Sequence, residues 1–462
     1  MKLLVDTVMG KPHQLAGSRI GKLVSSNRDA LLCLIDQGIV SVAGFATSVL
    51  IGRLAPTQLG VYYIGMAMVL FARGFQQQLV STPYTIFHHR KSDQLAAYRG
   101  SCLVQQVIFL AVTLAYLVVQ ILIASSGFIL LGIACYTGWQ IADWGYLSSE
   151  SIEVMPTLIV LAALIPIVLM REIVRHYCFT HSKNSSALGL DTAISVIQIL
   201  GIIGLGYLGF LSGATAWGVI SLACLVALFF WYRLDGPSIE LPGDHLKEDL
   251  KLNWSFGKWA VSGQFVGSLP SYLLPWLLLL ATGVEGTSLF AAGMTLVGIA
   301  NIFNTGMLNF LTPRAAQVYV EEGSVGLKRV LFRMYGLFLV VVGSFAVFVV
   351  IFGGSLAATI FGPDFAGLQS VLTLLVIAKL FEGFSHTASG GLFAMERIKA
   401  NFWIDVVLMF VTITAAILLI KPLGVWGAAW TFLIGSVTGA VLRSILVVKF
   451  LGEDSTSGSS NV

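Results

Sequence analysis

The sequence LLCLIDQGIVSVAGFATSVLIG (31–52) is an apolar run of about the length that crosses a bilayer core as a helix. A second run, VYYIGMAMVLFARGFQQQLVS (61–81), follows after a short gap, and the basic cluster HHRK (88–91) comes next. Charged residues stand mainly between the runs, but Asp36 and Arg73 lie inside them. This pattern predicts an all-α polytopic membrane protein with some polar groups in its interior.

The composition of the whole chain agrees with this prediction. Of 462 residues, 56% are hydrophobic and only 11% are charged, with a mean hydropathy of +0.87. A soluble protein carries about a quarter charged residues. The net charge of +4 comes from dispersed Lys and Arg, so nucleic acid is not expected as a partner. The five cysteines are scattered and form no CxxC pair. Their spacing therefore indicates neither a disulfide framework nor a zinc site.

Twelve membrane spans of similar length can be drawn along the chain. They lie near 31–52, 61–81, 101–124, 154–178, 187–208, 213–232, 260–282, 287–311, 330–353, 366–393, 402–421 and 425–449. The short apolar segment 127–141 is interpreted as an extension or interfacial piece and not as a thirteenth span. Gaps after the even-numbered spans are basic, whereas the alternate gaps are mostly acidic. Positive-inside logic therefore predicts that both termini are cytoplasmic.

These spans divide the chain into five parts. We expect a cytoplasmic N-terminal segment (1–30), a first six-helix half (31–233), a cytoplasmic amphipathic linker (234–259), a second six-helix half (260–450) and a disordered tail (451–462).

The two halves show weak internal similarity. Asp191 precedes Gly213-Ala214 by the same spacing at which Asp405 precedes Gly427-Ala428. Although Gly-Ala pairs are common in membrane helices, this spacing favours a duplication. Two six-span halves of the same orientation would be parallel repeats, with a substrate site between them.

Enzyme signatures are absent from the sequence. It contains no phosphate-binding GxxxxGK[ST], no GxSxG and no HExxH, so no catalytic residue, metal ligand or cofactor is predicted. The outer gaps are too short for a polymerase or ligase domain, which argues against a membrane enzyme that acts on an exported glycan.

Charges inside the spans are the candidate functional residues, because a charge in hydrocarbon must face a partner or water. Arg73, Lys258 and Lys379 are the candidate substrate-binding cations, and Arg73 has no acidic neighbour in sequence. Lys379 and Glu382 are three residues apart and can pair along one helix face, in a structural or a functional role. Asp191 and Asp405 stand near span ends, where the structural interpretation, snorkelling or helix capping, is favoured.

Three segments resemble the polysaccharide-exporter branch of the multidrug/oligosaccharidyl-lipid/polysaccharide superfamily, the oligosaccharide flippases of bacterial envelope synthesis. They are DQGIVSVAGFATSVLIGRLAPTQLGVYYI (Asp36–Ile64), FLTPRAAQVYVEEG (Phe310–Gly323) and IKPLGVWGAAWTFLIGS (Ile420–Ser436). Their order, together with twelve spans in two halves, carries the resemblance over essentially the whole chain.

The resemblance implies a flippase that turns an undecaprenyl-diphosphate-linked oligosaccharide across the bacterial inner membrane for polysaccharide synthesis. It implies contact with membrane lipids and coupling to a polysaccharide polymerase, and leaves the oligomeric state open. A cationic cavity of Arg73, Lys258 and Lys379 would suit a diphosphate. Asp36 stands where some relatives have a basic residue, so Asp36 and Glu382 are candidates for ion coupling. The alternative is a cation-coupled multidrug exporter, which would favour acidic residues in its cavity.

Overall fold

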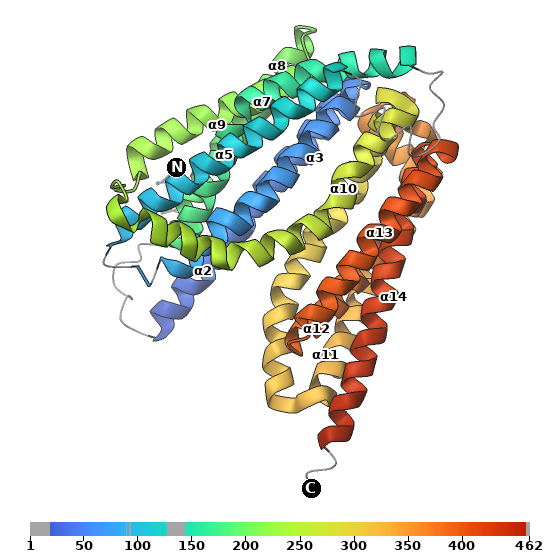
Figure 1. Cartoon of the computed structure of the whole chain (residues 1–462). Coiled ribbons are helices and arrows are strands. Elements are labelled where there is room, and N and C mark those ends of the chain that lie inside the picture. Colours follow the sequence, from blue (N-terminus) through green and yellow to red (C-terminus); the bar gives the residue numbers. More distant parts are fainter. Residues whose placement is uncertain (1–18, 89, 92–93, 127–143, 459–462) are drawn as a thin grey trace.

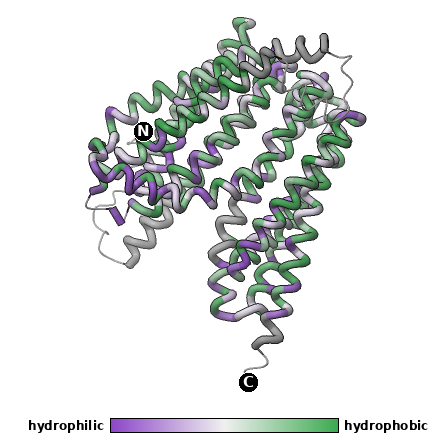
Figure 2. Tube along the Cα trace, viewed as in Figure 1, coloured by the Kyte–Doolittle hydropathy of each residue, from purple (hydrophilic) through white to green (hydrophobic). Residues whose placement is uncertain are grey.

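The computed structural model describes residues 19–88, 90–91, 94–126 and 144–458, and within these ranges every regular element is a helix. Eleven of the helices are long and apolar enough to cross a membrane. Hydrophobic residues run along most of them, while hydrophilic residues gather toward helix ends and at a few internal points (Figure 2). The prediction of an all-α polytopic membrane protein is confirmed. The predicted interfacial segment 127–141 lies outside the described residues.

The helices follow the predicted spans closely in chain order. In the first half they are α2 (Arg19–Leu54), α3 (Gln58–Gln76), the π-helical turn η2 (Gln77–Ser81), α4 (Thr82–Phe87), α5 (Leu95–Ser126), α7 (Trp144–Thr180), α8 (Asn184–Tyr207) and α9 (Gly213–Asp235). They continue with η5 (Gly243–His245), α10 (Leu246–Val297), α11 (Ile299–Phe361), η6 (Pro363–Leu368), α12 (Gln369–Ala394), α13 (Ile398–Leu423) and α14 (Val425–Gly458).

Two of these helices are too long for one crossing. The 52 residues of α10 and the 63 residues of α11 would measure about 78 Å and 95 Å as straight helices, against a hydrocarbon core of about 30 Å. Each is broken at a glycine with positive φ, Gly283 (φ 70°) in α10 and Gly323 (φ 66°) in α11. Only glycine adopts such a conformation at no steric cost. The eighth predicted span, 287–311, lies between the two breaks, which reconciles eleven long helices with twelve spans.

The predicted linker does not form a helix of its own. Residues 246–259 are instead the first turns of α10, which lie against the first half. Asp249 pairs with Lys91 at 3.0 Å and accepts a hydrogen bond from Ser101 at 2.6 Å. Four residues on, Asn253 accepts a hydrogen bond from Tyr98 at 2.9 Å. Because these buried polar groups find partners on the first half, α10 is anchored there and continues unbroken to Gly283.

The last helix also extends beyond its predicted end at residue 450. It continues to Gly458, into the segment predicted as a disordered tail, and an ion pair between Lys449 and Glu453 at 3.9 Å spans one of the added turns.

The structure repeats one turn in each half. Ser182, before α8, and Glu396, before α13, are the non-glycine residues with positive φ in the described chain, at 54° and 57°. Asp191 and Asp405 each follow nine residues later. A shared strained turn at a shared spacing supports the predicted duplication.

α10 packs along α3 and also contacts α5, where the hydroxyls of Tyr116 and Tyr272 lie 2.6 Å apart. Beyond these contacts, the second half touches the first half mainly at one end of the molecule (Figure 1). There the Ser288 hydroxyl accepts a hydrogen bond from the Gly60 amide at 2.8 Å and donates one to the Thr57 carbonyl at 2.8 Å. Nearby, Arg53 donates to the carbonyl of Thr359 at 3.2 Å. Toward the end where the C-terminus lies, α12, α13 and α14 diverge from the first half.

Candidate functional site

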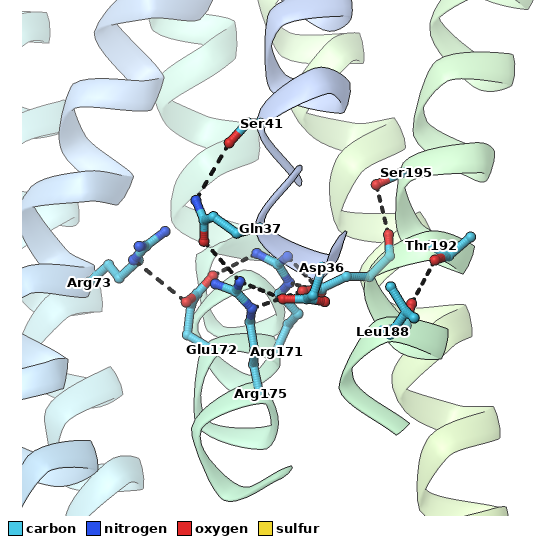
Figure 3. A network of polar contacts seen from close by, with 11 residues as sticks. Asp36, Gln37, Ser41, Arg73, Arg171, Glu172, Arg175, Leu188, Thr192 and Ser195 are labelled. Atoms are coloured by element: carbon cyan, nitrogen blue, oxygen red, sulfur yellow. Dashed lines mark hydrogen bonds and ion pairs between the residues drawn. The ribbon is translucent and has the colours of Figure 1, made fainter. Parts of the chain in front are cut away.

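A cluster of six charged side chains lies within the first half, and Figure 3 shows it. Its centre is α7, where Arg171 and Arg175 are one helical turn apart and therefore project from the same face. Arg175 contacts Asp36 of α2 at 2.7 Å and Asp191 of α8 at 2.8 Å. Arg171 contacts Asp191 at 2.6 Å and its neighbour Glu172 at 2.6 Å. The cluster thus joins the consecutive helices α7 and α8 to α2, which is far from them in sequence.

Arg73 of α3 forms the edge of this cluster. Its guanidinium lies 3.5 Å from Glu172, and 39% of its side chain is exposed against 5% of the glutamate. The π-helical turn η2 begins four residues later, and just before it the Gln76 amide donates a hydrogen bond to the Leu169 carbonyl at 2.7 Å. Single π-helical turns occur frequently at functional sites.

The first-half cluster is electrically balanced, with three arginines and three carboxylates. Asp36 and Asp191 are fully buried, so each depends on its arginine partners for compensation. One carboxylate oxygen of Asp36, Oδ1, is buried without a hydrogen-bond partner among the described residues. Such an atom is a position where a proton or a small cation could bind.

A second polar cluster surrounds Arg443 of α14 in the other half. The guanidinium donates to Asn401 at 2.9 Å and to Ser385 at 2.5 Å, and it forms an ion pair with Asp405. These residues come from α13 and α12, so the cluster again joins three helices.

A pocket of about 220 Å³ opens beside this second cluster, between α10, α12, α13 and α14. Its apolar wall includes Pro270 and Phe432, and its polar wall includes Glu382, His386, Asp405 and Arg443. The mixture of one guanidinium, one imidazole and two carboxylates can bind either sign of charge, and hydroxyls of Ser385, Thr412 and Ser436 add neutral hydrogen-bonding groups.

The predicted pair of Lys379 and Glu382 is present, with 2.7 Å between its charged atoms. The lysine side chain is only 4% exposed and lies over the Phe432 ring at 4.9 Å, whereas the glutamate is 28% exposed. His386 follows one turn later, 3.7 Å from the same carboxylate. Glu382 is therefore the member of the pair that reaches the pocket.

The predicted site residues do not form one cavity. Arg73 and Asp36 belong to the first-half cluster, and Lys379 and Glu382 lie in the second half. Lys258 is exposed on the first part of α10, 5.9 Å from the Trp259 ring centre.

Two interpretations from the sequence need correction. Arg73 has no acidic neighbour in sequence, but the fold brings Glu172 of α7 to it. Asp191 does not snorkel to a membrane edge, because it is fully buried between two arginines. Asp405 likewise forms an ion pair, with Arg443.

Four further residues were missed as candidates: Arg171, Glu172, Arg175 and Arg443. Arg171 and Arg175 stand near the end of the fourth predicted span, 154–178, and fit the basic gap that follows it, while Glu172 lies between them. Arg443 lies inside the last predicted span, and its charge in an apolar run was the signal that could have found it. Among the described residues no group of three or more His, Cys, Asp or Glu could hold a metal ion.

No protein-family model and no curated protein matches the chain. Solved structures do resemble it. One is the inward-facing conformation of a multidrug resistance MATE family transporter of the MOP superfamily, which is 15% identical, with a TM-score of 0.73 over 90% of this chain and 96% of that one. The outward-facing conformation of such a transporter gives 14% identity and a TM-score of 0.61, with 98% of both chains covered.

A third similar structure is a MOP superfamily transporter from Pyrococcus furiosus, described as having a binding pocket of reverse polarity that suggests a different function. It is 15% identical, with a TM-score of 0.60 over 97% of this chain and 98% of that one. These likenesses show that the chain has the fold of MATE transporters.

Proposed function

We propose that this protein is a transporter that carries its cargo across a membrane by alternating access between its two halves. The observation that carries the proposal is that the halves meet through Gly60, Ser288 and Thr359 at one end and diverge at the other. The higher TM-score to the inward-facing neighbour than to the outward-facing one supports the same state for this structure. By positive-inside logic the diverging end, with the C-terminus, is cytoplasmic.

For the cargo we propose an undecaprenyl-diphosphate-linked oligosaccharide at the bacterial inner membrane. Arg73 supports this cargo because it is the most exposed of the three arginines in its cluster and can offer its guanidinium to a diphosphate. The second-half pocket supports it as well, because its hydroxyl and charged groups suit a polyhydroxylated sugar. Lys379 forms an ion pair with Glu382, and Lys258 is exposed on the first part of α10. Arg73 is therefore the main proposed contact to the diphosphate.

A cation-coupled multidrug exporter is the second candidate. Glu382 and Asp405 both line the second-half pocket and could attract a cationic drug. Two of the similar structures are of multidrug resistance MATE family transporters. In either case Asp36, with its unpartnered oxygen, is our proposed site for a coupling ion.

Reconstitution in liposomes separates the two cargoes. We expect the protein to translocate a fluorescent undecaprenyl-diphosphate oligosaccharide, and Arg73→Ala to reduce the rate by about tenfold or more. A tenfold reduction corresponds to the loss of about 1.4 kcal/mol of interaction between Arg73 and the diphosphate. The matched control is Arg233→Ala, an exposed arginine at the end of α9. Efflux of a cationic dye without movement of the oligosaccharide would favour the exporter and contradict the proposed cargo.

A further inference from the structure

A second cavity, of about 300 Å³, lies within the first half, and the charged residues of the first-half cluster are not part of its lining. It occupies the furrow between α5 and α9, which both pack against α7. Its floor is α7, through Met170, Ile173, Val174 and Tyr177. Because it does not open between the halves, its role is separate from that of the cargo pathway.

The lining of this cavity suits hydrocarbon. Leu103, Ile173 and Leu228 are among the apolar residues around it, and no Asp, Glu or Lys is included in its lining. Pro237 and Ile239, in the loop that follows α9, complete the lining. Beside them Arg99 donates a hydrogen bond to the Ser238 carbonyl at 3.2 Å.

The flanks of the furrow face the membrane. On α9, Phe229, Phe230 and Tyr232 are 54%, 59% and 62% exposed. On α5, Val107 and Ile108 are 60% and 51% exposed. Exposed aromatic and aliphatic side chains in a membrane-spanning bundle contact lipid, so a lipid chain can enter the furrow from the side.

Two cations lie close to the ring of Tyr177, which lines the cavity. The Arg99 guanidinium carbon lies 5.5 Å from the centre of the Tyr177 ring, and the Lys183 amino nitrogen lies 5.6 Å from it. The two charges are thus no more than about 11 Å apart. Arg99 also donates to the Tyr84 hydroxyl at 3.4 Å, and Lys183 donates to the Asp235 backbone carbonyl at 3.3 Å.

Neither cation has an ion pair with a carboxylate in the part of the chain that the structure describes. The nearby Asp235 carboxylate accepts instead from the Ser186 hydroxyl at 2.5 Å. Two neighbouring like charges that form no ion pair, beside an apolar cavity, are complementary to a phosphate that carries a hydrocarbon chain.

We propose that this furrow binds an anionic glycerophospholipid of the surrounding bilayer. One acyl chain fills the cavity between α5 and α9, and the phosphate lies between Arg99 and Lys183. This proposal does not depend on the cargo or on transport.

Lipid retention by the purified protein tests the proposal. The protein is exchanged into nanodiscs with equal amounts of phosphatidylglycerol and phosphatidylcholine of the same chains, extracted, and weighed by native mass spectrometry. We expect retained lipid to be mainly phosphatidylglycerol. Its preference should fall about fivefold in Arg99→Gln and about thirtyfold when Lys183→Gln is added, since each cation attracts anionic lipid by about 1 kcal/mol.

Two further variants separate the chain from the headgroup. Leu103→Trp fills the cavity and should reduce retention of both lipids, whereas Arg233→Gln, an exposed arginine of α9 outside the cavity lining, should leave retention unchanged. Circular dichroism and the elution volume establish that each variant is folded.

Three results would overturn the proposal. One is a phosphatidylglycerol preference in the double variant within twofold of the unaltered protein. Another is displacement of the lipid by glycerol 3-phosphate alone, which would mean that the cavity takes no chain. The third is displacement by an equal amount of undecaprenyl phosphate, which would assign the furrow to the cargo lipid.

Discussion

Replacing Arg175 by alanine should destabilise the protein by an amount that the first-half cluster determines. Asp36 is fully buried and has one ion pair among the described residues, to Arg175 at 2.7 Å. Asp191 loses one of its two ion pairs but keeps the one with Arg171 at 2.6 Å, so its charge stays compensated. Breaking a buried pair from one side costs about 3–5 kcal/mol, because the remaining charge is uncompensated. We therefore expect Arg175→Ala to lower the free energy of unfolding by about 3–5 kcal/mol.

A second substitution tests whether the stranded charge is the cause. In the double variant Arg175→Ala/Asp36→Asn the buried carboxylate becomes a neutral amide, and the cost should fall to about 1–3 kcal/mol, that of an unsatisfied polar group. The double variant should thus be more stable than Arg175→Ala alone. Purified protein in detergent is unfolded with increasing SDS, and unfolding is followed by tryptophan fluorescence.

Arg233→Ala is the matched control, because this arginine is exposed and contacts the Phe229 ring, 5.2 Å away. It should change stability by no more than about 0.5 kcal/mol. The reasoning fails if Arg175→Ala costs less than about 1 kcal/mol, or if adding Asp36→Asn lowers stability further.

Three other predictions concern the contact between the halves, the second cluster and the topology. A side chain at Gly60 would place its Cβ 2.7 Å from the Val284 carbonyl oxygen, so Gly60→Val should separate the contacting ends of the two halves. An unchanged distance between spin labels on the two ends would contradict this prediction. Arg443→Gln removes an ion pair and should reduce transport by about tenfold or more with normal membrane insertion; transport within twofold of the unaltered protein would exclude the second cluster from the mechanism. A cysteine at Asp364 should react with an impermeant maleimide from outside intact cells and one at Arg397 only after permeabilisation, and the opposite result would reverse the orientation.

The sequence predicted the membrane architecture well, because the relevant signal is local. A run of about twenty apolar residues favours a helix wherever it lies, and the structure is helical at every predicted span, although the eighth is divided between the end of α10 and the start of α11. What the sequence did not predict was where helices continue through an expected boundary. The polar segment 246–259 became part of α10 because Asp249 and Asn253 have partners on α5 and beside α4, which local sequence cannot show.

The candidate site was harder to predict, because its chemistry depends on pairs between distant residues. Arg73 and Glu172 are 99 positions apart in the chain, and Asp36 and Arg175 are 139 apart. Charges within spans could be located from the sequence, yet whether each was compensated could not. Only Lys379 and Glu382, three residues apart on one helix, could be paired in advance.

The balanced charges of each half have a consequence for the energy of movement. Arg175 with Asp36 and Arg443 with Asp405 each lie within a single half, and no recorded ion pair joins residues 31–233 to residues 260–450 in the described chain. Opening the contacting end therefore breaks hydrogen bonds such as that between Gly60 and Ser288, but exposes no stranded charge. In the proposed alternating access, the ion pairs within each half therefore stay intact, and the work of the motion is left to neutral contacts.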